Sequence, residues 1–125
     1  MTDDEFERWI AAYIARQASD AIPGPDNDPQ FWAVDTFFRL NDEDPALCWK
    51  AILEILGRKP GDKVLGVLAA GPLEDLVGCH GPAFIDRIDA EARRNPDFRS
   101  LLGGVWQAST PEVWQRVLRA RGRAW

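Results

Sequence analysis

Six of the nine prolines in this 125-residue chain follow a residue suited to capping or turning, and each opens an apolar stretch. Proline is favoured at the first position of a helix, because its fixed φ suits the helix and the N–H there has no intrahelical partner. Asp, Asn or Thr directly before it can accept a hydrogen bond from the amides of the first turn. The pattern therefore predicts many short helices. The six pairs are Asp28-Pro29, Asp44-Pro45, Gly71-Pro72, Gly81-Pro82, Asn95-Pro96 and Thr110-Pro111.

The apolar spacing between these prolines is helical, and the chain has no sustained alternation of the kind that strands require. Thr2 and Glu5 have the spacing of a capping box, so the first helix is expected to begin at Thr2. A loop is expected over 19–28, and the later helices over 29–40, 45–56, 63–70, 72–77, 82–94, 96–102 and 110–119. We predict an all-α fold of seven to eight short helices packed as antiparallel hairpins, either a compact bundle or a short α-solenoid (HEAT-like).

Burial is predicted from the same spacing. In 29–40, Phe31, Val34 and Phe38 share one side, which we expect to be buried. Of the six tryptophans, Trp9, Trp32 and Trp49 lie among apolar helical positions and are expected in the core. Trp106 and Trp114 are the candidate interaction residues, with Trp106 either a surface anchor or a plug at the end of the bundle.

Length and charge limit the class of protein. A chain of 125 residues is expected to form a single helical domain over 1–125. The net charge is −5, with −7 on residues 1–62 and +2 on 63–125, which makes nucleic-acid binding an unfavoured function. Four arginines in the last ten residues are expected to form a solvated helix end. They are Arg116, Arg119, Arg121 and Arg123.

No apolar run is long enough for a membrane helix, and the acidic start is unlike a secretory signal, so we expect a cytoplasmic protein with no membrane partner. Cys48 and Cys79 lie 31 positions apart, and the chain has one histidine, so one copy cannot assemble a Cys/His zinc site. We expect no metal and no cofactor.

The segment from Leu65 to Trp114 carries a distinctive pattern. It begins with Ala69-Ala70-Gly71-Pro72-Leu73-Glu74-Asp75-Leu76 and continues through Leu101-Leu102-Gly103, Val105-Trp106 and Trp114. In these residues the chain resembles a family of small bacterial proteins or domains of unknown function. The resemblance implies a compact helical fold and a bacterial, intracellular origin, and it brings no catalytic residues.

Glu74, Asp75 and His80 are the one grouping that looks like a catalytic site. Two carboxylates and an imidazole could supply an acid/base pair or bind a divalent cation. The structural alternative places Glu74 in the first turn of a helix that begins at Pro72, where it caps free amides. A further alternative is an ion pair from Glu74 to Arg87 or Arg93 that fixes how two hairpins dock.

The sequence favours a non-enzymatic module that binds another protein, with an immunity-like or defence-associated role and a basic partner steered by the acidic half. The alternative is a small metal-dependent or acid/base hydrolase centred on Glu74, Asp75 and His80.

Overall fold

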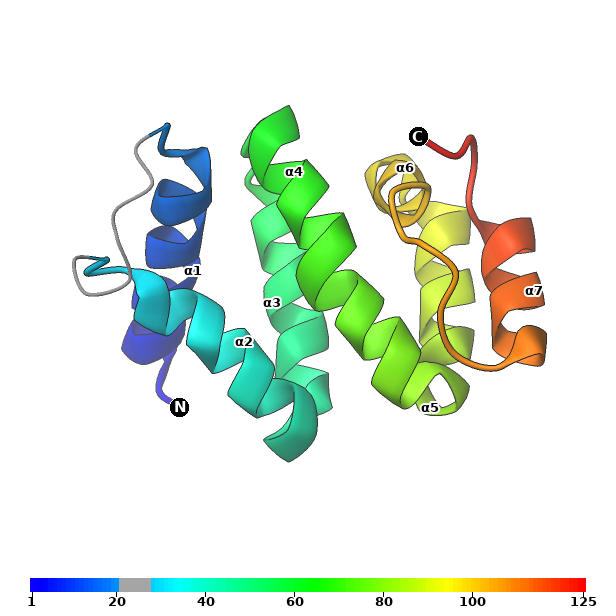
Figure 1. Cartoon of the computed structure of the whole chain (residues 1–125), viewed down its shortest axis with the longest axis horizontal. Coiled ribbons are helices and arrows are strands. Elements are labelled where there is room, and N and C mark those ends of the chain that lie inside the picture. Colours follow the sequence, from blue (N-terminus) through cyan, green and yellow to red (C-terminus); the bar gives the residue numbers. More distant parts are fainter. Residues whose placement is uncertain (21–27) are drawn as a thin grey trace.

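The computed structural model describes residues 1–20 and 28–125, and all regular structure within them is helical. The all-α prediction is confirmed. The elements are α1 (Asp3–Ala18), α2 (Phe31–Glu43), α3 (Pro45–Gly57), α4 (Asp62–Leu68), the π-helix η2 (Ala69–Leu73), α5 (Glu74–Arg94), α6 (Pro96–Leu102) and α7 (Pro111–Ala120). In Figure 1 they follow one another from α1 and α2 at one end of the molecule to α6 and α7 at the other.

Four helix starts are as predicted. Thr2 and Glu5 form a complete capping box on α1, with Thr2 Oγ1 accepting from Glu5 N at 3.1 Å. The other three starts have proline at the first position and a capping side chain before it, so local chemistry sets these boundaries. The capping residues are Asp44, Asn95 and Thr110.

Pro72 does not start a helix, contrary to the prediction, whereas Pro82 stands at the start of the helical segment that follows a break at His80, as predicted. The helices expected over 63–70 and 72–77 join into one path through α4, η2 and the first part of α5, and the helix expected over 82–94 is the second part of α5. A proline inside an α-helix removes one hydrogen bond and clashes with the carbonyl four residues earlier. Here Pro72 lies in the wider π-helical turn, and a kink at His80 (φ −131°, ψ 20°) precedes Pro82. Among the described residues, the difference from the predicted seven to eight helices is therefore the fusion of 63–70 with 72–77 through the π-helical turn.

Pro29 also precedes its helix rather than opening it, since α2 begins at Phe31. Asp28 Oδ1 accepts a hydrogen bond from Gln30 N at 3.1 Å, and Asp28 Oδ2 pairs with Arg16 Nε at 2.8 Å. These two contacts of Asp28 hold the chain in place just before α2. Most of the loop predicted over 19–28 lies outside the described residues.

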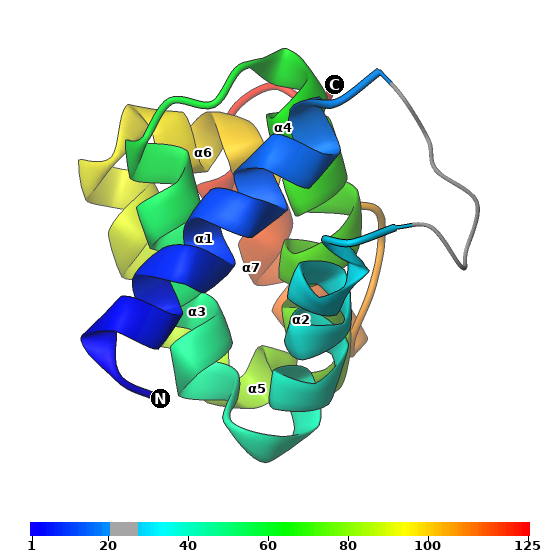
Figure 2. The same cartoon turned by 90° about the vertical axis from the view of Figure 1, so that its left-hand side faces the viewer.

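The buried side chains form one connected cluster to which every helix contributes. The helix α3 contacts α1, α2, α5, α6 and η2, and α1 crosses in front of it in Figure 2. Trp9 is fully buried, and its Nε1 donates to the Ala33 carbonyl at 2.9 Å, so α1 and α2 approach closely at a small residue. Among the described residues, no helix is both long enough and apolar enough to cross a bilayer.

Candidate functional site

The structure separates the three residues of the candidate catalytic group. Glu74 Oε1 accepts a hydrogen bond from Trp106 N at 2.9 Å, and His80 Nε2 contacts the carbonyl of Asn41 at 2.5 Å. Asp75 lines a small cavity that neither Glu74 nor His80 lines. Within residues 1–20 and 28–125, no group of three His, Cys, Asp or Glu side chains is placed to bind a metal ion. The geometry therefore does not assemble an acid/base or metal site from these residues.

Glu74 does not have the structural role that the sequence suggested. Because no helix starts at Pro72, Glu74 meets no free first-turn amides, and its carboxylate instead holds the loop between α6 and α7 at Trp106 N. None of the ion pairs among the described residues joins Glu74 to Arg87 or Arg93. Glu74 lies on the part of α5 before the kink at His80, and Arg87 and Arg93 lie on the part after it.

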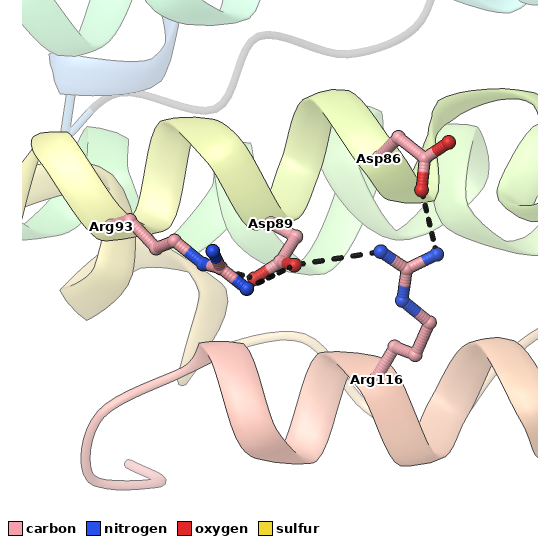
Figure 3. A network of polar contacts seen from close by, with 4 residues as sticks. All are labelled: Asp86, Asp89, Arg93 and Arg116. Atoms are coloured by element: carbon pink, nitrogen blue, oxygen red, sulfur yellow. Dashed lines mark hydrogen bonds and ion pairs between the residues drawn. The ribbon is translucent and has the colours of Figure 1, made fainter.

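Both arginines have nearer partners on α5. Arg93 Nη2 pairs with Asp89 Oδ2 at 3.0 Å, one turn away. The Arg87 guanidinium lies over the ring of Phe84, 4.9 Å from its centroid. Asp89 also accepts from Arg116 of α7, so the network that contains Arg93 joins α5 to α7 (Figure 3).

The two candidate interaction tryptophans have different surroundings. Trp106 is 79% exposed in the loop between α6 and α7, so it does not plug the bundle. Trp114 is 8% exposed, and the Arg121 guanidinium lies 5.9 Å from its ring centroid. Only Trp106 of the pair presents its ring at the surface.

The outer face of α2 was missed by the sequence analysis. The predicted buried side of Phe31, Val34 and Phe38 is wrong: the phenylalanines are 47% and 57% exposed. The residues buried from this helix are Ala33, Thr36, Phe37 and Leu40, and Trp32 is 46% exposed. The sequence did contain a signal for this arrangement, since Ala33, Phe37 and Leu40 are also at helical spacing.

Two aspartates share this outer face with the phenylalanines. Phe31, Asp35, Phe38 and Asp42 stand at positions i, i+4, i+7 and i+11, which lie on one stripe of a helix. We call these four residues the α2 outer face. Asp35 and Asp42 are exposed, and neither has an ion-pair partner among the described residues. The face therefore alternates apolar rings with uncompensated negative charge.

A cavity of about 100 Å³ adjoins this face, between α1, α2 and η2. Tyr13, Phe37, Phe38 and Val67 give it a largely apolar wall, and Asp75 contributes a carboxylate. Burial, together with the charge of Glu74, raises the pKa of Asp75, and the described residues provide it with no hydrogen-bond partner.

Tyr13 adds a polar group to this cavity wall. Its hydroxyl is buried beside Gln17 of the same helix, and burial raises the pKa of the phenol. The cavity is thus an aromatic pocket with a carboxylate that has no hydrogen-bond partner among the described residues, which suits a cationic group.

A comparison with protein families identifies one match: a family of unknown function, DUF6869, matches residues 20–125. The chain belongs to DUF6869. The segment from Leu65 to Trp114 lies within the matched residues, and the match also takes in α2, α3 and α7. No curated protein and no solved structure gives a significant match.

Proposed function

We propose that this DUF6869 protein is a non-enzymatic module that binds a basic partner protein through the α2 outer face. The observation that carries the proposal is the alternation of exposed rings with unpaired carboxylates along that face. Exposed aromatic residues supply contact area at interfaces, and unpaired aspartates select a positively charged partner.

The charge of the molecule supports the same partner. Residues 1–62, which include the whole of α2, carry a net charge of −7. Such a field steers a basic protein towards this end of the molecule and raises its association rate. An immunity-like or defence-associated role, in which a small acidic protein neutralises a basic one, fits this arrangement.

The cavity at Asp75 gives the interface a specific contact. A lysine side chain of the partner would place its ammonium group against the Asp75 carboxylate and its methylene groups against Phe37 and Phe38. The Asp75 carboxylate would then have a partner. The hydrolase alternative gains no comparable support, because Glu74, Asp75 and His80 do not converge.

The proposal treats residues 1–125 as one domain that acts in the cytoplasm, and the single connected core of the described residues supports the single domain. The order of the helices from one end of the molecule to the other favours the short α-solenoid alternative over a symmetric bundle (Figure 1).

The test uses a synthetic peptide of alternating lysine and leucine, titrated into ¹⁵N-labelled protein at low salt. We expect chemical-shift changes in α2 and around Asp75. Changing Asp35 and Asp42 together to asparagine should weaken binding at least about tenfold, since two charge-assisted contacts are lost. The matched control is Asp4→Asn with Glu112→Gln, which removes the same charge from α1 and α7 and should leave binding within about twofold. Equal weakening by both double variants, or shift changes confined to other helices, would reject the α2 outer face as the interface.

A further inference from the structure

A cavity of about 630 Å³ lies among helices at the opposite end of the molecule from α2 (Figure 1). It is bounded by α5, α6 and the end of α7, and we call it the arginine cleft. Its lining contains five arginines and one carboxylate, a net charge of +4 in a protein whose overall charge is −5. The charged residues are Asp89, Arg93, Arg99, Arg116, Arg119 and Arg121.

Asp89 organises one wall of the cleft. Its side chain is 23% exposed and accepts from Arg93 on its own helix and from Arg116 Nη2 at 3.4 Å across the gap to α7. Arg116 Nη1 also donates to Asp86 Oδ1 at 2.7 Å (Figure 3). These contacts hold two guanidinium groups in place, which lowers the entropy lost when a ligand binds. The predicted solvated arginine end is therefore, at Arg116, an ordered link between α7 and α5.

The remaining arginines are oriented in different ways. Arg99 Nε donates to the Ala92 carbonyl at 2.9 Å, close to the end of α5. Arg121 lies over Trp114, and Arg119 is exposed with no ion pair in the part of the chain that the structure describes. Asp89 already has two partners, so no carboxylate in the lining compensates these three charges.

We propose that the arginine cleft binds a phosphate group. A carboxylate has two coplanar acceptor oxygens, and the carboxylate of Asp89 already accepts from Arg93 and Arg116. Guanidinium groups that reach the cleft from three helices match a tetrahedral dianion, which has acceptor oxygens on several sides. The open cleft has room for more than phosphate alone, which favours a phosphate ester on a larger molecule as the ligand.

The test is isothermal titration of the full chain with inorganic phosphate, with adenosine monophosphate and with acetate at matched ionic strength. We expect binding of both phosphates, tighter for the monoester, and none of acetate. Equal affinity for the two phosphates would assign the site to free phosphate. No heat with either phosphate at millimolar concentration, or acetate binding as well as phosphate, would overturn the proposal.

Arg119→Gln is the informative variant, because Arg119 makes no ion pair that the fold depends on. Losing one charge-assisted contact should weaken phosphate binding about tenfold or more. Arg8→Gln on α1 is the matched control: it also removes one exposed positive charge, and phosphate affinity should not change. If both variants weaken binding equally, the effect is one of net charge and the cleft is not the site. The outcome is independent of the basic-partner proposal, since the Asp35 and Asp42 variants leave the arginine cleft intact.

Discussion

Substitution of Gly81 by alanine tests the packing of α5 against α7. Gly81 is buried one residue after the kink at His80. A Cβ there would overlap Ser109 Oγ and lie 2.9 Å from Val113 Cγ1, at the start of α7. Alanine in place of glycine gains about 1 kcal/mol of helix propensity, and overpacking costs roughly 1–3 kcal/mol. We expect a net loss of up to about 2 kcal/mol in the free energy of unfolding, because the overlap with Ser109 Oγ places the cost towards the upper end of that range.

Gly78→Ala, on the other side of the kink in α5, is the matched control. A Cβ at Gly78 meets only Ala108 Cβ, at 3.8 Å, which is an ordinary contact. This variant should therefore gain about 0.5–1 kcal/mol from helix propensity alone. Urea unfolding of both variants followed by far-UV circular dichroism gives the comparison.

A second change at Ser109 separates the clash from other causes. Ser109 has φ 71°, in the left-handed region that favours glycine, and its Oγ is the closest obstacle to a Cβ at Gly81. Adding Ser109→Gly to Gly81→Ala should recover at least half of the lost stability. If Gly81→Ala is as stabilising as Gly78→Ala, the close approach of α7 to α5 is wrong.

Three further predictions concern carboxylates. Hydrogen bonds from Arg94 lower the pKa of Glu91 in the folded state, so this stabilisation is present at neutral pH and is lost as the pH falls through that lowered pKa. Glu91→Gln should cost about 1 kcal/mol at pH 7 and progressively less towards pH 3, as measured by urea unfolding across pH. The pKa of Asp75 is raised, so the ionised carboxylate opposes folding above its ordinary pKa. Asp75→Asn should raise the thermal midpoint at pH 7 and have no effect below about pH 3, as measured by thermal scans; a lower midpoint at pH 7 would contradict this. Glu74→Gln keeps an acceptor for Trp106 N and should leave the free energy of unfolding nearly unchanged. Glu74→Ala should lower the free energy of unfolding by about 1 kcal/mol and increase the mobility of the Trp106 ring, as measured by fluorescence anisotropy. A large loss of stability in Glu74→Gln would mean that Glu74 acts as a buried charge.

Local signals in the sequence predicted the helix starts that depend on local chemistry. Thr2, Asp44, Asn95 and Thr110 each cap a helix because the side chain reaches amides two or three residues ahead. This geometry is independent of the rest of the fold, so these four boundaries could be predicted from the sequence.

The start predicted at Pro72 failed for the opposite reason. A proline terminates a helix only where the chain cannot widen around it. At η2 the chain does widen around Pro72, with Leu73 buried in the core, whereas at Pro82 the helix does break, at His80. That choice is made by tertiary packing and has no local signal.

The same limit applies to the candidate sites. Two sets of apolar residues on α2 have helical spacing, one with Phe31 and Phe38 and one with Ala33 and Phe37. The close approach of Trp9 to Ala33 buries the second set. The arginine cleft draws Arg93, Arg99 and Arg119 from three helices, so no spacing along the chain brings it into view.

The most direct test of the central claim is a double-mutant cycle between Asp35 and the lysine–leucine peptide. Affinities are measured by calorimetry for wild-type and Asp35→Asn protein, each with the original peptide and with a peptide in which one lysine is replaced by norleucine. If the α2 outer face contacts the peptide, one lysine position will show a coupling energy of about 1 kcal/mol or more with Asp35. Coupling energies near zero at every lysine would contradict the assignment of the α2 outer face as the binding surface.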